Sequence, residues 1–356
     1  MFKVENYIME KIIDIGYFGK VLHTTKEGDN KKYATKVFNR DEVDSKSHIK
    51  QYLVNEITIL KNLNHPNICE LHDLKKTKRH YYIMMEYCNG GKLGRALHNY
   101  IKKNHKPFPE EIIQHLIRQI IEAFHYINGK KIIHRDFNLD SILLNYENEE
   151  DKENLNLIKA QVKIIGFGFA SFDHQRELSD TIDWLYLGRT PTIISKILKN
   201  RGKNEGDDIK SIGALCYEML LGKPIFNEED LEDFIEKNKK ENYNIPSTFS
   251  YEIVSFLNGM LQDTPNQRLT VGELFRHYFL NNEINQFKKI NLEQFSDIGS
   301  SGIINNKISK IKNITIWSIF NQKCEAFLNS ILGKQLINPI DEKEEIKQDR
   351  EEENVK

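Results

Sequence analysis

Two segments of the chain decide its fold: residues 134–144 read HRDFNLDSILL, and residues 162–168 read VKIIGFG. Each contains a short apolar run, at 142–144 and at 162–164, next to a polar or glycine-containing turn. Apolar runs bounded by turn residues predict a pair of strands. The acidic, asparagine-rich residues 145–156 between them predict a solvated loop. The two segments are thus expected to form one unit that carries a surface insertion.

Length and composition indicate a globular protein of more than one lobe. The chain has 356 residues, of which 39% are hydrophobic and 29% charged, enough for two lobes and a tail. A net charge of -1 and a pI near 6.9 provide no overall field that would attract nucleic acid or anionic lipid. We therefore expect neither nucleic acid nor a membrane as a partner.

Cysteine usage and the N-terminal sequence favour a reducing compartment. The 4 cysteines are far apart and form no C-x-x-C pair, so neither a zinc site nor a disulfide framework is indicated. No apolar run approaches the roughly 18 residues of a membrane span, and no signal peptide is apparent. These observations predict a cytoplasmic location and do not exclude the nucleus.

The first quarter of the chain is predicted to be an antiparallel sheet with one helix. Residues 6–40 contain short strand-like runs at 7–9, 11–13, 20–23 and 32–38, with hairpin residues at 28–30. Apolar residues at helical spacing predict a helix at 49–62, and 81–85 reads as a further strand. We assign residues 1–86 to this N-terminal lobe.

The rest of the chain is predicted to be mainly helical. Asn89, Gly90 and Gly91 mark a flexible joint, and helical spacing begins at Pro109. Residues 209–220 are apolar nearly all round, as in a buried central helix. The fold class is therefore α+β, with a helical lobe at 87–280 and a C-terminal extension at 281–356.

The two opening segments resemble the catalytic motifs of the eukaryotic protein kinases, H-R-D-L-x-x-x-x-N and D-F-G. The resemblance covers roughly residues 5–280 and implies a bilobal serine/threonine kinase fold, most similar to the calmodulin-dependent and calcium-dependent kinases. Asp136 stands at the position of the catalytic base, Ser141 at that of the metal-binding asparagine, and Gly166 at that of the metal-binding aspartate. Both protein ligands of the magnesium ions are therefore replaced.

The resemblance also implies a nucleotide site. Residues 13–21 resemble the glycine-rich loop with Asp14 in place of its first glycine, Lys36 matches the phosphate-binding lysine, and Glu56 matches its helix partner. Alone, such glycines more often mark a tight turn, and such a lysine and glutamate are usually surface residues. The expected nucleotide contacts are Ile13, Gly16, Gly19, Val21, Ala34, Lys36, Met85 as gatekeeper, Glu86 and Cys88 of the hinge, Leu93 and Leu143. Val21, Ala34, Leu93 and Leu143 match the positions that sandwich the adenine ring in the family. Core packing is the simpler interpretation of these four residues, and both roles can hold together.

Further residues match structural positions of the family. Leu60, His134, Phe167 and Asp208 match the internal column that joins the lobes, and Arg135 is available to an activation-loop phosphate. The family pairs Arg268 with a glutamate, but the chain has Lys196 at that place. Because like charges repel, we expect this region to be repacked or mobile.

Four substitutions weaken catalysis in the same direction. Gly166 and Ser141 remove the metal ligands, Asn138 replaces the catalytic-loop lysine, and Asp14 adds negative charge beside the phosphates. We therefore expect a pseudokinase that binds protein partners, with ATP binding left open and magnesium not bound in the usual way. The alternatives are a serine/threonine kinase with slow or metal-independent transfer and a structural domain that binds no nucleotide.

The extension contains one amphipathic segment. Residues 315–332 carry an apolar stripe at helical spacing, and the charged sequence from Asp341 is expected to be disordered. Such a stripe needs a partner, and we expect it to dock on the kinase domain in cis. Capture by a helix-binding protein such as calmodulin is the alternative, although only scattered lysines precede the stripe.

Overall fold

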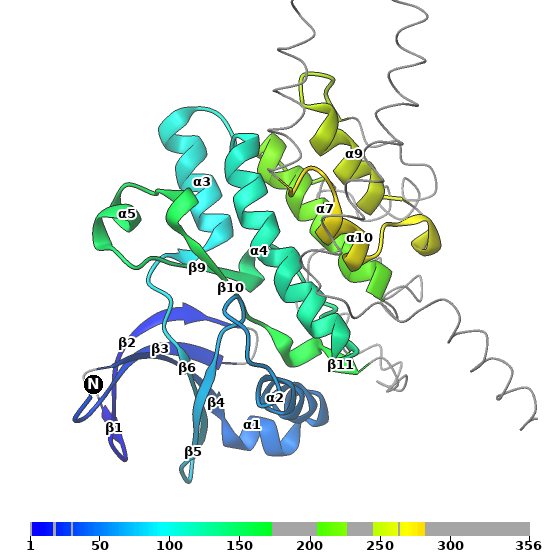
Figure 1. Cartoon of the computed structure of the whole chain (residues 1–356). Helices are drawn as coiled ribbons and strands as arrows, with labels where there is room; N and C mark the ends of the chain where they lie inside the picture. The colour runs from blue at the N-terminus through cyan, green and yellow to red at the C-terminus, as the bar shows by residue number, and fades with distance from the viewer. Residues whose placement is uncertain are drawn as a thin grey trace, which may run out of the picture. The chain divides into compact units, whose positions relative to one another are not determined.

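The computed structural model describes residues 2–16, 19–29, 31–172, 205–225, 245–262 and 264–281 (Figure 1). These residues all belong to the first of two units into which the chain divides, Met1–Gln286. The predictions for Lys196 and for the helix at 315–332 lie outside the described residues.

The N-terminal lobe is one antiparallel sheet in the order β1-β2-β3-β4-β6-β5. Alternating burial along the strands, clearest in β2 and β4, leaves one face of each against the core. The strands are β1 Phe2–Val4, β2 Tyr7–Ile15, β3 Gly19–Lys26, β4 Lys32–Asn39, β5 Leu71–Lys76 and β6 His80–Glu86.

Two details of this sheet differ from the sequence prediction. The runs at 7–9 and 11–13 form one strand, β2, whose pairing with β3 shifts twice between Met9 and Asp14. A bulge accommodates extra residues without ending a strand. The prediction of two separate strands was therefore wrong, because the irregular residues interrupt the sequence pattern but not the strand. Strands β1 and β5 were not predicted.

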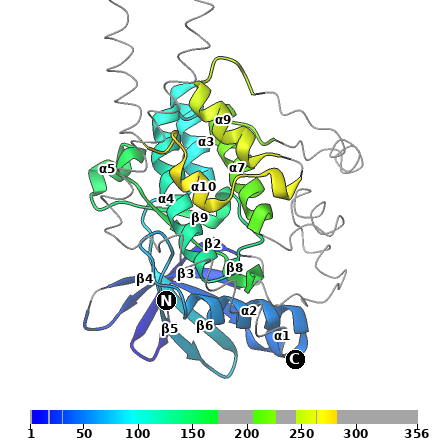
Figure 2. The same ribbon diagram turned by 45° about the vertical axis from the view of Figure 1, so that its right-hand side comes forward.

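Two helices lie beside the sheet in both views (Figures 1 and 2): α1 Arg40–Ser45 and α2 Ser47–Leu60. The predicted helix at 49–62 is confirmed by α2, which buries Leu53, Ile59 and Leu60. Helix α1 begins where the Asn39 side chain accepts a hydrogen bond from the amide of Glu42. It was missed because so short a helix has almost no periodicity.

The second lobe is mainly helical, as predicted. Its main helices are α3 Leu93–Asn104, α4 Glu110–Gly129, α7 Glu205–Leu221, α9 Tyr251–Met260 and α10 Val271–Arg276. Both α4 and α7 bury long apolar faces, and α7 is buried nearly all round. The predicted buried central helix is thus confirmed, and the arrangement is an antiparallel-sheet lobe followed by a helical lobe.

Short strands of the second lobe contain parts of the segments 134–144 and 162–168. Strands β7 Gly91–Lys92, β9 Ile142–Asn145 and β10 Gln161–Ile164 form one small sheet, and β8 Ile132–Ile133 pairs with β11 Ser171–Phe172. The predicted strand pair is therefore confirmed. The insertion predicted to be a loop contains a short helix, α5 Glu149–Glu153, followed by a 3-10 turn, η2 Leu157–Lys159.

The two lobes share one hydrophobic core. It runs from Leu60, Ile68 and Met85 on the sheet side to the buried faces of α4 and α7, while a second, smaller cluster fills the other face of the sheet. Backbone bonds also cross between the lobes, because Cys69 N donates to Ile164 O at 3.0 Å and Ile164 N to Asn67 O at 2.8 Å. The segment between α2 and β5 is therefore bonded directly to β10.

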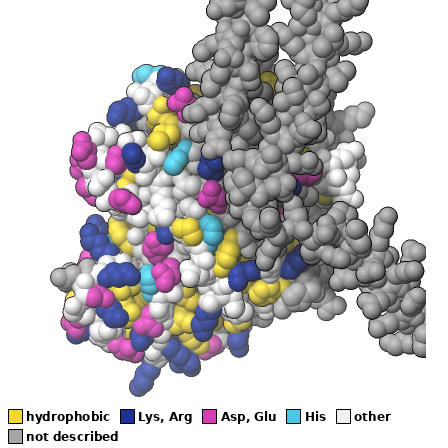
Figure 3. All heavy atoms as spheres, viewed as in Figure 1, with side chains coloured by type: hydrophobic (Ala, Val, Ile, Leu, Met, Phe, Trp, Pro, Cys, Tyr) yellow, Lys and Arg dark blue, Asp and Glu magenta, His cyan; other side chains and the backbone are white. Residues whose placement is uncertain are grey.

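The described surface carries mixed charge. Acidic and basic side chains are interspersed over the sheet lobe on the face seen in Figure 3. Among the described residues, no helix is both long and apolar enough to cross a membrane.

Candidate active site

The catalytic loop lies between β8 and β9 and is held by a buried histidine. His134 Nδ1 is 3.3 Å from the Asp136 amide that donates to it, so Nε2 carries the proton and donates to Ile165 O at 3.0 Å. Burial lowers the pKa of His134, which keeps the ring neutral in this arrangement. His134 thus ties the loop to the strand that leads to Gly166.

Asp208, from the central helix α7, braces the same loop from the other side. Its Oδ2 accepts from the amide of His134 at 2.7 Å, and its Oδ1 accepts from the amide of Arg135 at 2.9 Å. Arg135 has a φ of 68°, a conformation that costs energy for a residue with a side chain. The two charge-assisted bonds help to hold this turn, and Asp136 is buried beside it.

Ser141 and Asn138 bond to each other within the loop. They form a capping box at the 3-10 turn η1 Leu139–Ser141, in which Ser141 Oγ accepts from Asn138 N at 2.9 Å and donates to Asn138 O at 2.8 Å. The Asn138 side chain in turn accepts from the amide of Asp140 at 2.8 Å. Both polar side chains therefore support the backbone of the loop.

Gly166 lies next to this turn with a left-handed backbone, φ 90° and ψ 36°. A Cβ built there would lie 3.7 Å from Ser141 Cβ and 3.9 Å from His134 Cε1, so space exists for a side chain. Magnesium requires oxygen ligands, but Gly166 has no side chain to supply one, and the Ser141 hydroxyl is already hydrogen-bonded to the backbone of Asn138. Among the described residues there is also no group of three or more His, Cys, Asp or Glu that could hold a metal. The residues present do not fit the family's magnesium site.

Lys36 of β4 and Glu56 of α2, expected to pair, lie in contact through Lys36 Nζ and Glu56 Oε1. The Glu56 side chain is 0% exposed and that of Lys36 is 18% exposed. A buried glutamate requires a charged partner, so this pair fixes α2 against the sheet. The second carboxylate oxygen, Glu56 Oε2, is buried without a hydrogen bond to the described residues.

The turn after Gly166 packs against α2. Phe167, in η3 Phe167–Phe169, is fully buried with its ring centroid 4.9 Å from that of His134. Gly168 lies so close to Tyr52 of α2 that a Cβ would be 2.2 Å from Tyr52 Cε2. The predicted column of Leu60, His134 and Phe167 is thus composed of buried side chains, with Asp208 bonded at its base.

The glycine-rich segment forms the turn between β2 and β3. Gly16 N donates to Gly19 O at 2.8 Å. A Cβ on Gly19 would be 2.1 Å from Val37 O, whereas one on Gly16 would meet nothing closer than 3.6 Å. Gly19 is therefore required by close packing of β3 on β4, which is a sufficient reason for that glycine without any ligand.

The predicted adenine contacts come from both lobes. Ala34 and Met85 are neighbours across β4 and β6, and Leu143 lies in β9. Met85, Cys88 and Leu93 are buried. Between described residues, no backbone hydrogen bond uses the amide or carbonyl of Cys88, so the hinge group assigned to adenine is not engaged there. The remaining predicted contacts are placed on β2 (Ile13) and β3 (Val21).

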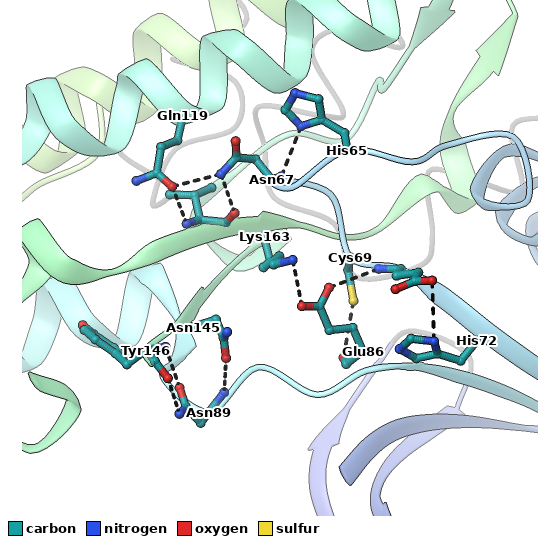
Figure 4. Close-up of polar contacts among 12 residues, drawn as sticks. His65, Asn67, Cys69, His72, Glu86, Asn89, Gln119, Asn145, Tyr146 and Lys163 are labelled. Carbon is teal, nitrogen blue, oxygen red and sulfur yellow. Dashed lines mark hydrogen bonds and ion pairs between the residues drawn. The ribbon is translucent and has the colours of Figure 1, made fainter. Parts of the chain in front are cut away.

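The hinge is bonded to the second lobe by a charged pair that the sequence reading missed (Figure 4). Lys163 Nζ of β10 lies 2.7 Å from Glu86 Oε1, and both side chains are at least three-quarters buried, with exposures of 9% and 23%. Cys69 Sγ lies 3.4 Å from the Glu86 carbonyl. A lysine within the apolar run VKII was the available signal, because a charge in a buried strand is usually paired.

Asn67 adds a neutral link beside this pair. Its amide nitrogen Nδ2 donates to Gln119 Oε1 at 2.9 Å and to Val162 O at 3.0 Å, and Gln119 Oε1 also accepts from Val162 N at 2.9 Å (Figure 4). These bonds join the segment after α2 to α4 and β10. The geometry around the hinge is therefore set by polar groups from both lobes.

Arg268 also finds a partner in the structure. Its Nη1 lies 3.3 Å from Asp207 Oδ1, with side chains 1% and 9% exposed, and its Nε donates to Gln262 O at 2.7 Å. The charge of Arg268 is thus compensated within the described part of the chain. Lys196, which we expected to face it, is outside that part.

Comparison with known proteins agrees with this geometry. Residues 7–280 match the protein kinase domain. The chain belongs to the protein kinase domain family. Its kinase domain retains the Lys36–Glu56 contact and the Asp208 brace, while the positions of both metal ligands are altered.

Individual relatives are serine/threonine protein kinases of moderate similarity. The chain is 28% identical to the serine/threonine-protein kinase atg1 of Dictyostelium discoideum over 79% of this chain and 40% of that protein. It is 28% identical to AtPK2/AtPK19 of Arabidopsis thaliana, covering 76% and 52%, and 27% identical to the SNF1-related catalytic subunit KIN12 of the same plant, covering 85% and 59%. The chain thus spans about half the length of the curated relatives it matches.

Proposed function

We propose that this kinase domain is a pseudokinase: it lacks ordinary magnesium-dependent phosphotransfer and acts through protein partners. The observation that carries the proposal is the pair Gly166 and Ser141. One has no side chain, and the hydroxyl of the other is bonded to the backbone of Asn138. No protein ligand of the usual kind is left at either metal position.

The size of the expected loss follows from the role of the metal. Metal ions supply several kcal/mol of charge stabilisation in such reactions, and about 4 kcal/mol corresponds to roughly a thousandfold in rate. Asn138 also leaves the loop without the lysine of the serine/threonine kinases, and Asp14 adds a negative charge. Together with Gly166 and Ser141, these two substitutions support a very low rate of phosphotransfer.

Nucleotide binding is the part of the kinase activity that the remaining geometry favours. This part of the proposal is supported by the contact between Lys36 and Glu56 and by the positions of Ala34 in β4 and Leu143 in β9. We propose that ATP binds weakly and without magnesium. The resemblance to calmodulin-dependent and calcium-dependent kinases remains a prediction from the sequence.

One observation favours the alternative, a serine/threonine kinase with low or metal-independent activity. Asp136 is buried in a loop that Asp208 and His134 hold firmly, and Lys36 is positioned by Glu56. These are the parts of the catalytic apparatus that do not depend on a metal. A weak enzyme would need only these groups and a bound nucleotide.

A phosphotransfer assay separates the two functions. We expect incorporation of labelled phosphate by the full chain to equal that of the Asp136→Asn variant, with magnesium, with manganese and with EDTA. Asp136→Asn removes the proposed base and retains its size, so it is the matched control. Phosphate incorporation that Asp136→Asn abolishes would establish the alternative.

A further inference from the structure

Two cysteines lie together at the hinge. Cys69 precedes β5 by two residues, and Cys88 follows the end of β6 by two residues. Because β5 and β6 are antiparallel neighbours, the start of one lies opposite the end of the other. A backbone bond from Glu86 N to Glu70 O, 2.9 Å long, joins the two segments at this point. The strand pairing therefore brings both cysteines, which are free thiols, to one place.

The two thiols share a hydrogen bond inside the protein. This bond and, after it, burial raise the pKa of the Cys69 thiol well above its ordinary value. Cys69 is 2% exposed and Cys88 is 8% exposed. Cys69 Sγ also donates to the carbonyl oxygen of Glu86 at 3.4 Å (Figure 4). The sulfur of Cys69 is thus held against the hinge by contacts with two hinge residues.

Such a contact is the geometric requirement for a disulfide. Two cysteines are joined without backbone movement only where their side chains already face each other at short range, and thiols that share a hydrogen bond do so. Disulfides in a reducing compartment are usually transient and redox-sensing. A pair of free thiols in contact is therefore suited to reversible oxidation.

From these contacts we propose that Cys69 and Cys88 are a redox-active pair that hydrogen peroxide converts into a disulfide. Peroxide first oxidises the Cys88 thiol to a sulfenic acid, and one water leaves. The sulfur of Cys69 then attacks the Cys88 sulfur, the S–O bond breaks, and a second water leaves. The two thiols lose two electrons and two protons in total, and these reduce the peroxide to water. The inference goes beyond the proposed function and does not depend on nucleotide binding.

The order of the two steps follows from exposure. Cys88 is the more exposed thiol, whereas Cys69 is almost completely buried and is kept protonated by its surroundings. Since the thiolate is the reactive form, we expect peroxide to react more slowly with this pair than with an exposed thiolate. Once Cys88 is oxidised, Cys69 is already in position, and held reactants combine faster than separate ones.

Oxidation also changes the hinge itself. Cys69 loses the hydrogen that its Sγ donates to the Glu86 carbonyl, and the new bond ties Cys88 to the segment before β5. Glu86 and Cys88 are the hinge residues expected to contact adenine. The disulfide therefore acts on the hinge at the place where a nucleotide is proposed to bind.

Peptide mapping of the full chain tests the pair. The folded protein is treated with hydrogen peroxide, its remaining thiols are blocked with N-ethylmaleimide in urea, and it is digested with trypsin without reduction. Cleavage places Cys69 on peptide 62–75 and Cys88 on peptide 80–92. We expect mass spectrometry to find these two peptides linked, and dithiothreitol to separate them again.

Two variants provide the comparison. Cys69→Ala should abolish the link and leave Cys88 as a thiol or a sulfenic acid. Cys216→Ala is the matched control, because Cys216 is also a buried free thiol but lies in α7, where burial and then Glu110 of α4 raise its pKa. Its yield of the Cys69–Cys88 link should equal that of the unaltered chain.

Three results would overturn the inference. One is that peptides 62–75 and 80–92 stay separate in the folded protein when peroxide is present in excess. Another is that Cys69 or Cys88 links instead to Cys216 or Cys324. The third is a Cys69–Cys88 link that forms in urea but not in the folded chain, because the folded structure would then not be what brings the two thiols together.

Discussion

Ser141 Oγ accepts a hydrogen bond from the amide of Asn138 at 2.9 Å and donates one to its carbonyl at 2.8 Å. A serine at a metal-binding position is thereby used to close the catalytic loop. These bonds and those of Asp208 hold the shape of the loop. Position 141 no longer supplies the amide oxygen with which the family binds magnesium. Structure and metal binding are thus separable at this site.

Restoring both metal ligands should restore metal binding. We expect Gly166→Asp combined with Ser141→Asn to bind magnesium with ATP and to autophosphorylate measurably, and either single change to do much less, because groups that act as one unit are not additive. Gly166 has φ 90°, and aspartate is among the residues that best tolerate a positive φ. Phosphate incorporation and magnesium-dependent calorimetry measure the result. A double variant that binds magnesium and ATP yet stays inert would mean that Asn138, Asp14 or the region of Lys196 imposes a second block.

Asp208 should carry a large share of the stability of the catalytic loop. Asp208→Ala leaves the amides of His134 and Arg135 without their acceptor, and each unsatisfied buried donor costs about 1–3 kcal/mol. We expect the free energy of unfolding in urea to fall by at least about 2 kcal/mol, and Asp208→Asn to cost less because one acceptor remains. Glu153→Ala, at an exposed residue of α5, is the control and should change little. Equal stability of Asp208→Ala and Glu153→Ala would contradict the bracing role.

The domain should lose stability in mild acid partly through His277. Burial lowers the pKa of His277 to about 4, while its Nδ1 accepts from Phe279 N at 3.2 Å and Ser255 Oγ lies 3.4 Å from Nε2. The unfolded chain binds a proton at this residue near pH 6.5, so stability is fully present above that pH and is lost as the pH falls toward 4. We expect the free energy of unfolding of the His277→Gln variant, measured in urea, to depend less on pH between 6.5 and 4 than that of the unaltered chain. A variant curve parallel to that of the unaltered chain would show that His277 does not titrate on unfolding.

The C-terminal extension should contribute to stability if its apolar stripe docks in cis, as the sequence suggests. Deleting residues 313–356 is then expected to lower the melting temperature and to increase binding of a dye that reports exposed apolar surface. These residues lie outside the described part of the chain, so the prediction rests on the sequence alone. An unchanged melting temperature without added dye binding would favour a free helix that seeks another partner.

The two-lobed fold could be predicted from the sequence because its signals are local. The helical spacing of α2 and α4 and the apolar α7 are repeated over many residues, and each such helix was anticipated. Strand β5 was missed because its residues are only half-buried and do not alternate. A strand whose residues do not alternate between buried and exposed carries no clear periodic signal.

The site was predictable where a motif names the residue. His134, Asp208 and the pair Lys36 and Glu56 were all named from resemblance, and the structure places them in contact as the motifs imply. The ion pairs of Lys163 with Glu86 and of Lys92 with Asp14 were not predicted, because each joins residues far apart in the sequence at no characteristic spacing. The hydrogen bonds between Ser141 and Asn138 could not be predicted from the sequence either, because a hydroxyl group can donate to or accept from many different partners.

An ATP titration of the full chain, by calorimetry or thermal shift, with and without magnesium, measures whether the domain has lost its metal site. Ligand that binds only the folded protein stabilises it by mass action. We predict weak binding whose affinity is the same in magnesium and in EDTA, because Gly166 and Ser141 lack the carboxylate and the amide oxygen with which the family binds the metal. Clear tightening by magnesium in the unaltered protein would contradict the account, since it would require a metal site that these residues do not form.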